Sequence, residues 1–250
     1  MSLEQMEKTD FWYQTPPGCF LLEQEVRIVG DLLCRIPGET LVQIGGPSDL
    51  SLVKDSLIKH KYFMTLNGQI TPKVASAYVD PYQLPLLPGS VDVCVVPHVL
   101  SYVEEPQALI EQVGQSLKEG GTLFVIGFNP WSLWNLSRLR FKRKFPWSGN
   151  FRSCFTVKRW LKKVKMQVIF DKTFCYRPQV MTKSRWNRFR WCDFIGRLFF
   201  PRNGAVYIIM AQKQQEGMTP LLADLLSDKK LMINRGAMKP MTRLHSKYEE

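Results

Sequence analysis

A glycine-rich turn, Gly45-Gly46-Pro47, is the first stretch of the chain whose residue types favour ligand binding. It follows the apolar run Leu41-Val42-Gln43-Ile44, which predicts a short buried strand. Glycines let the backbone approach a ligand closely, and the N–H groups that open a following helix can hold a carboxylate or a phosphate. Glycine is equally common in strand-to-helix turns that bind nothing, so the turn by itself leaves both interpretations open.

Two nucleotide-binding fingerprints are absent from the sequence. No GxxxxGK segment followed by Ser or Thr is present, which argues against a phosphate cradle for a nucleoside triphosphate. No GxGxxG segment follows the first apolar run either. About twenty residues beyond Gly45, where the dinucleotide fingerprint has an acid, the chain reads Thr65-Leu66-Asn67.

Continuous apolar runs alternate along the chain with stretches of helical periodicity. The turns between these predicted strands and helices are where a ligand-binding site is expected. The sequence predicts strands at 41–44, 62–66, 74–79, 91–96, 122–128, 168–175 and 205–211. Helices are expected from Ser48 or Asp49 to about His60, and over 104–118, 157–164 and 182–200. Continuous apolar strands are typical of a parallel sheet covered on both faces, and ligands bind such sheets beyond the carboxyl ends of the strands.

Four short motifs follow one another between Val79 and Phe128: Asp80-Pro81-Tyr82-Gln83-Leu84-Pro85, Ser90-Val91-Asp92-Val93, Pro97-His98-Val99-Leu100-Ser101-Tyr102 and Leu117-Lys118-Glu119-Gly120-Gly121. Their order closely resembles the type 11 group of class I S-adenosylmethionine-dependent methyltransferases, over residues 20–136. The run from Gly127 to Trp134 further resembles a bacterial, YafS-like subgroup. The resemblance implies a Rossmann-like α/β fold with a seven-stranded, mostly parallel sheet whose last strand is antiparallel.

The same resemblance implies S-adenosyl-L-methionine as the cofactor. The two glycines would pass close to its methionine moiety, Asp80 would hydrogen-bond the adenine amino group, and Asp92 would be structural. The cofactor-binding residues implied in this way are Gly45, Gly46, Asn67, Asp80, Pro81, Pro97 and His98. A helical prelude (1–40) would precede the methyltransferase domain (41–212), which carries insertions at about 129–155 and 177–202, and a loosely ordered tail (213–250) would follow it.

The glycine turn departs from the family pattern. The usual GxGxG is reduced to Gly45-Gly46-Pro47-Ser48, and the acid of the first strand is replaced by Gln43. The ribose-binding acid that the resemblance implies after the second strand is missing, and the amide of Asn67 could take its place. These departures keep open a degenerate methyltransferase-fold protein that binds a ligand or partner without turnover.

Methyl transfer needs little catalytic machinery, because the sulfonium is already an activated electrophile and the protein mainly aligns the nucleophile. If the nucleophile must lose a proton, His98 at the end of a central strand is the expected base. A histidine there is as often a packing or cofactor-contact residue. The acceptor pocket is expected to involve Tyr102, Asn129, Trp131 and Trp134. No metal site is expected, because no cluster of His, Cys and acidic residues is written in the sequence.

The net charge of +12 is concentrated in one part of the chain. Residues 138–202 hold 19 Lys and Arg against two acids, together with four of the seven tryptophans. The helix expected at 182–200 has Trp191, Phe194, Ile195, Leu198 and Phe199 on one side. That side could pack on the sheet, cap the active site, lie on an anionic membrane surface or bind single-stranded nucleic acid.

The expected function is therefore S-adenosylmethionine-dependent methyl transfer to a small-molecule or lipid-like acceptor. The alternatives are the degenerate binding protein and an RNA methyltransferase, the latter because of the basic segment. The six widely spaced cysteines suit a reducing cytoplasm. No apolar run approaches the roughly 18–20 residues of a membrane span, so we expect a cytoplasmic protein, either free or peripheral to the inner face of the membrane.

Overall fold

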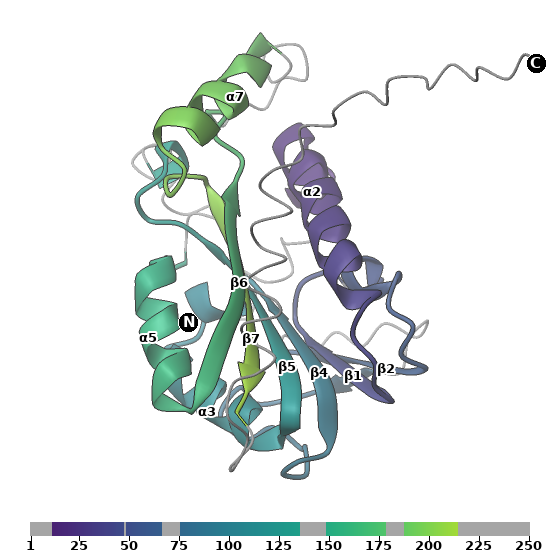
Figure 1. Ribbon diagram of the computed structural model, residues 1–250. Coiled ribbons are helices and arrows are strands. Elements are labelled where there is room, and N and C mark those ends of the chain that lie inside the picture. The colour runs from purple at the N-terminus through teal and green to yellow at the C-terminus, as the bar shows by residue number, and fades with distance from the viewer. Residues whose placement is uncertain (1–11, 48, 67–75, 136–148, 179–187, 215–250) are drawn as a thin grey trace, which may run out of the picture. The chain divides into compact units, whose positions relative to one another are not determined.

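Seven strands form one sheet in the order β3-β2-β1-β4-β5-β7-β6, with helices on both faces (Figure 1). The computed structural model describes residues 12–47, 49–66, 76–135, 149–178 and 188–214, which lie in one compact unit. The strands are β1 (Thr40–Ile44), β2 (His60–Thr65), β3 (Ser76–Tyr78), β4 (Val91–Pro97), β5 (Leu117–Phe128), β6 (Met166–Phe174) and β7 (Val206–Lys213). All neighbouring pairs are parallel except those that involve β7, which runs antiparallel to both β5 and β6. The predicted seven-stranded sheet with an antiparallel last strand is confirmed.

The sheet separates two apolar cores. Helix α2 (Pro16–Leu33) covers one face through Leu21, Val29 and Leu33. Helices α3 (Pro106–Ser116) and α5 (Cys154–Lys163) cover the other face, where they pack against alternate residues of the same strands. Because both faces are covered, β4 and β5 carry nearly continuous apolar residues, which is the pattern that made these strands predictable.

The helix predicted from Ser48 or Asp49 to about His60 is wrong. Within the described residues this stretch holds only the three-residue 3-10 helix η1 (Ser51–Val53). The Asp49 carboxylate accepts a hydrogen bond from the backbone N–H of Ser51, and Leu50 has a left-handed backbone with φ 54°. A short polar side chain that bonds to its own backbone stabilises a turn in competition with a helix. The expected helix N-terminus for a carboxylate or phosphate is therefore absent from this position.

The other elements match their predicted positions with shifted ends. β5 begins at Leu117 instead of residue 122, because Leu117 already pairs with Val91 of β4. The last helix, α7, spans Arg190–Phe199. Residues 67–75, 136–148, 179–187 and 215–250 lie outside the described residues, and with them the predicted site residue Asn67 and most of the predicted tail. Among the helices that are described, none is long and apolar enough to cross a lipid bilayer.

Candidate functional site

The turn after β1 has the backbone geometry that its glycines allow. Gly45 and Gly46 have φ angles of 71° and 77°, which side-chain-bearing residues rarely adopt. A Cβ atom added at Gly46 would lie 2.3 Å from Cγ of Pro97, at the end of β4. Two of the predicted cofactor-binding segments, the turn after β1 and the end of β4, are therefore in direct contact.

Gln43, which replaces the acid of the family pattern, holds this turn in place. Its side-chain Nε2 donates hydrogen bonds to the carbonyl oxygens of Gly45 and Pro47, at 2.9 and 3.0 Å. Its Oε1 is buried and has no hydrogen-bond partner among the described residues. A glutamine can make these two bonds whereas a carboxylate cannot, since an ionised acid has no donor.

His98 lies directly after β4 and is held by groups from α2 and β5. Its Nε2 forms a 2.8 Å contact with Oε1 of Glu25, which comes from α2. Its ring stacks on Phe128 at the end of β5, with ring centroids 4.2 Å apart. Its backbone is left-handed, with φ 59°, and His98 N donates to the carbonyl oxygen of Ile126. This conformation is unusual for a residue other than glycine and turns the imidazole toward α2 and away from the strand direction.

The Glu25–His98 pair is buried, with exposed fractions of 0% and 3%. The second oxygen of the carboxylate, Glu25 Oε2, and the second ring nitrogen, His98 Nδ1, have no hydrogen-bond partner in the described part of the chain. A buried polar atom without a partner costs about 1–3 kcal/mol. Gln43 Oε1 on β1 is a third such atom. The three atoms thus come from β1, from the end of β4 and from α2, which covers both strands.

Glu25 is the residue that the sequence analysis missed. It follows Leu21 by four residues and precedes Val29 by four, so it lies on the apolar stripe of α2, and all three side chains are 0% exposed. An acid in the middle of an apolar stripe was the available signal, but it does not reveal its partner. His98 is 73 residues further along the chain.

Asp80 lies on the surface, in the turn that follows β3. Its Oδ1 accepts a hydrogen bond from the backbone N–H of Tyr82 at 2.8 Å, within the sequence in which Pro81 follows the acid. The Tyr82 hydroxyl in turn accepts bonds from the backbone N–H groups of Glu104 and Glu105, next to the start of α3. These hydrogen bonds order the turn locally and tie it to the start of α3.

Asp92 has the structural position expected for it. Its carboxylate accepts hydrogen bonds from the backbone N–H groups of Glu39 and Thr40 and forms an ion pair with Lys118 at 2.9 Å. Burial raises the pKa of Asp92, but the bonds from Lys118 and from the two backbone groups lower it by more, so the pKa lies below its usual value. These contacts join the entrance of β1 to β4 and β5.

The predicted acceptor-pocket residues differ in accessibility. Tyr102, Asn129 and Trp134 are buried, and burial raises the pKa of the Tyr102 hydroxyl. Asn129 donates to the carbonyl oxygens of Arg202 and Gly204, and Trp134 Nε1 donates to the carbonyl oxygen of Arg177. Trp131, by contrast, is 76% exposed. The structure therefore places three of the four side chains in the protein interior and one on the surface.

Aromatic rings cover the pair on the α2 side. Phe128, which stacks on His98, also lies 5.1 Å from Phe151 and 6.1 Å from Trp12, measured between ring centroids. Trp134 packs against both Phe128 and Trp12. Trp134 thus belongs to an apolar aromatic cluster beside the imidazole, which excludes water from it.

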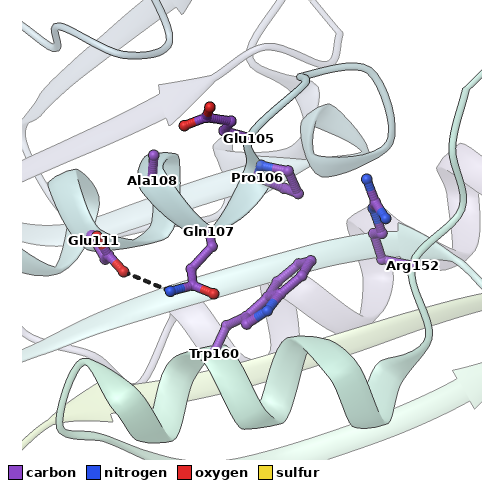
Figure 2. A pocket seen from close by; sticks show the side chains of 7 residues that line it. All are labelled: Glu105, Pro106, Gln107, Ala108, Glu111, Arg152 and Trp160. Carbon is purple, nitrogen blue, oxygen red and sulfur yellow. Dashed lines mark hydrogen bonds between the residues drawn. The ribbon is translucent and has the colours of Figure 1, made fainter.

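A cavity of about 320 Å³ lies elsewhere, between α3 and α5 (Figure 2). Figure 2 shows Trp160 of α5 facing the first turns of α3, where Gln107 donates a hydrogen bond to Glu111. Because α3 and α5 cover the face of the sheet opposite to α2, this cavity and the Glu25–His98 pair lie on different faces. None of the predicted site residues lines it; the lining residues are Glu105, Pro106, Gln107, Ala108, Glu111, Arg152 and Trp160. Among the described residues there is also no group of three His, Cys, Asp or Glu side chains that could hold a metal ion.

Comparison with known proteins finds a matching family model and one similar bacterial protein. The model of the methyltransferase domain family matches residues 61–125, from β2 into β5. The chain is 24% identical over 215 residues to the uncharacterized protein YafS of Escherichia coli K12, which covers 84% of this chain and 83% of that protein. The YafS-like resemblance expected from residues 127–134 agrees with this relative.

Solved structures show the same fold. A S-adenosylmethionine-dependent methyltransferase from Thermotoga maritima superposes with a TM-score of 0.62 at 17% identity, over 85% of this chain and 97% of its own. Geranyl diphosphate C-methyltransferase from Streptomyces coelicolor, solved with geranyl diphosphate and S-adenosyl-L-homocysteine, superposes with a TM-score of 0.53 at 17% identity, over 78% and 80%. Residues 61–125 thus match the methyltransferase domain family, and the chain has the class I fold of these S-adenosylmethionine-dependent methyltransferases.

Proposed function

We propose that the chain is an S-adenosylmethionine-dependent methyltransferase that acts on a small-molecule or lipid-like acceptor. The observation that carries the proposal is a set of buried, unpartnered polar atoms at the carboxyl ends of β1 and β4 and on the covering helix α2: Gln43 Oε1, His98 Nδ1 and Glu25 Oε2. Buried polar atoms are normally satisfied, so their presence beside the glycine turn favours a polar ligand at this edge. Class I sheets bind their ligands at the same edge.

The residues present fit S-adenosylmethionine, which carries a positively charged sulfonium and an amino group that donates hydrogen bonds. Gln43 Oε1 and Glu25 Oε2 are acceptors, and the left-handed Gly45 and Gly46 leave no side chain between the turn and a ligand. Glu25 would provide the negative charge that Gln43 no longer provides in β1. When bound, the cofactor supplies a methyl group on a sulfonium, which needs no further activation.

His98 would then accept the proton of the acceptor's nucleophile, through the ring nitrogen that Glu25 does not hold. The contact between Glu25 Oε1 and His98 Nε2 fixes the orientation of the imidazole, so that a proton on Nε2 is held by the carboxylate and Nδ1 is left to act as the base. In this arrangement Glu25 is a positioning residue. The buried aromatic cluster would exclude water, and the exposed Trp131 would be the first contact for an arriving acceptor.

A calorimetric titration with S-adenosylmethionine and S-adenosylhomocysteine tests the cofactor site. We expect micromolar binding that weakens at least tenfold in Glu25→Gln and is unchanged in Glu23→Gln, which alters an exposed glutamate on the same helix. Asp80→Asn tests the adenine contact that the family resemblance implies. Undiminished binding in Glu25→Gln would contradict the assignment of Glu25.

The acceptor class can be tested with methyl-labelled S-adenosylmethionine and three bacterial fractions: total lipid, total RNA and small molecules. We expect label in the lipid or small-molecule fraction, and we expect His98→Gln to abolish its transfer without a matching loss of cofactor binding. Glu25→Gln should shift the pH dependence of the rate, which a purely structural role would leave in place. Transfer at the full rate in His98→Gln would exclude the proposed base.

The degenerate binding protein is a second candidate, and one specific observation favours it. The turn after β1 leads into only a three-residue 3-10 helix, and Gly46 is packed directly against the ring of Pro97. Both features reduce the room and the backbone N–H donors available to a cofactor. Absence of binding at millimolar S-adenosylmethionine would favour this candidate over the enzyme.

A further inference from the structure

Helix α7 exposes an apolar face to solvent. Trp191, Phe194, Ile195, Leu198 and Phe199 have exposed fractions between 40% and 73%. They follow the spacing i, i+3, i+4, i+7 and i+8, which places them along one side of an α-helix. The neighbouring Phe200 is also 59% exposed. Of the alternatives left open for this side, packing on the sheet does not apply to these residues.

The opposite side of α7 fixes the helix to the protein. Gly196 lies against the ring of Tyr176, where an added Cβ would approach Cγ of that ring. Asp193 accepts a hydrogen bond from the backbone N–H of Tyr176 at 2.9 Å and forms an ion pair with Arg177. The carbonyl oxygen of Pro201, just beyond the helix, accepts a bond from the Tyr176 hydroxyl. These contacts hold the small and acidic side inward, so the apolar side is turned outward, which is the reverse of an ordinary surface helix.

Positive charge lies beside the apolar face. Arg188 and Arg197 are exposed at the two ends of the helix. Burial and repulsion from Arg197 and Arg27 lower the pKa of Lys172 on β6, against an opposing effect of the nearby Asp31. The sequence from 138 to 202 has only two acids, Asp171 and Asp193, and each is paired with a basic residue, Lys158 and Arg177 respectively.

We propose that α7 docks the protein on the surface of an anionic lipid bilayer. An interfacial helix has an apolar face with large side chains, cations at its border and a length that does not span the membrane. Trp191, Phe194 and Leu198 would enter the boundary between headgroups and acyl chains, and Arg188 and Arg197 would contact lipid phosphates. α7 joins β6 to β7 at the sheet edge where β5 and β6 end, which is the edge of the candidate site.

Two other occupants fit the face less well. Single-stranded nucleic acid binds through aromatic stacking and cations, which gives the exposed aliphatic residues Ile195 and Leu198 no role. A second copy of the chain would need roughly 800 Å² of surface from each partner, whereas a helix of this length is only about 15 Å long. A bilayer does not require a large complementary protein surface. It accounts for both the exposed apolar residues of α7 and the arginines beside them. The proposal does not depend on methyl transfer.

Flotation of the full chain with lipid vesicles tests the proposal. The vesicles are phosphatidylcholine alone, or phosphatidylcholine with phosphatidylglycerol. We expect binding to the vesicles that contain phosphatidylglycerol, weakened by added salt. Phe194→Ser and Leu198→Ser should each lower the partition coefficient roughly tenfold, because each removes a large apolar group from the interface. Leu57→Ser and Leu87→Ser, at leucines more than 70% exposed elsewhere, are the matched controls and should leave it unchanged.

The charge contribution has its own pair of variants. Arg197→Glu should reduce binding to anionic vesicles about tenfold, whereas Lys163→Glu on α5 should have a smaller effect. Absence of binding to anionic vesicles, or equal binding by wild type and the α7 variants, would overturn the proposal. A fluorescently labelled single-stranded RNA serves in parallel. RNA binding that Phe194→Ser abolishes and Leu198→Ser leaves in place, without vesicle binding by the wild type, would assign the face to nucleic acid instead.

Discussion

Each single variant of the Glu25–His98 pair should lower the free energy of unfolding strongly. The double variant should lower it by less than the sum of the two single effects. Glu25→Ala leaves the His98 imidazole buried without its 2.8 Å partner, and His98→Ala leaves a carboxylate that is 0% exposed without its hydrogen-bond partner. Breaking a buried pair in this way costs about 3–5 kcal/mol. His98→Ala also removes the stacking on Phe128, which is worth about 1 kcal/mol.

The double variant removes both polar groups at once and leaves neither unpaired. Its destabilisation should therefore be smaller than the sum of the single variants by about 2–3 kcal/mol, the coupling energy of residues in direct contact. Urea denaturation of the wild type, the two single variants and the double variant, followed by tryptophan fluorescence, gives the four free energies of unfolding. The transition slope must stay constant across the set for the differences to be compared.

Glu25→Gln keeps the shape of the side chain and serves as a milder probe. It should cost about 1–2 kcal/mol, because the amide oxygen can still accept a hydrogen bond from the imidazole. Additive single variants, with a coupling energy below about 0.5 kcal/mol, would refute the reasoning, because residues without energetic contact add in this way. In that case the pair would contribute neither to stability nor to the orientation of His98.

Three other regions give predictions of comparable precision. Gly46→Ala should destabilise the protein by about 2–3 kcal/mol, because it combines a left-handed backbone with a clash against the ring of Pro97. Gly89→Ala, at a position with φ 65° and open space around it, should cost only about 1 kcal/mol. Equal melting temperatures of the two variants would contradict the contact between Gly46 and Pro97. Asp92→Asn should cost about 1–2 kcal/mol at pH 7. Because the native pKa of Asp92 lies below the unfolded value of 3.8, its contribution is present above that pH and is lost as the pH falls through the native pKa, so unfolding curves of wild type and variant should converge in acid and diverge at neutral pH. Asn129→Ala should cost about 2–4 kcal/mol, because it removes three hydrogen bonds and leaves their partners in the protein interior unpaired. Trp131→Ala, at an exposed position, should change the stability by no more than about 0.5 kcal/mol. Similar calorimetric melting temperatures for the two variants would show that the Asn129 amide has no structural role.

The fold could be predicted from the sequence because its signals are local. The apolar residues of β4 and β5 form continuous runs, which only a sheet buried on both faces requires, and α3 shows regular apolar spacing before Gly120-Gly121. The order of the motifs in residues 80–121 resembles the type 11 methyltransferase group, and the methyltransferase domain model matches residues 61–125, which include these motifs. The predicted helix after β1 failed because capping residues are ambiguous. The same Asp49 that can cap a helix bonds instead to the N–H two residues on.

The candidate site depended on contacts between distant parts of the chain. Helical spacing placed Glu25 on the apolar stripe of α2, but only the packing of α2 over the sheet brings it to His98, 73 residues away. The outward side of α7 was undetermined for the same reason. Its five large apolar residues define a face in any helix, and periodicity carries no information on whether that face meets the sheet or the solvent. Here the ring of Tyr176 occupies the space beside Gly196 and the Arg177–Asp193 pair fixes the inner side, so the tertiary structure alone turns the apolar face outward.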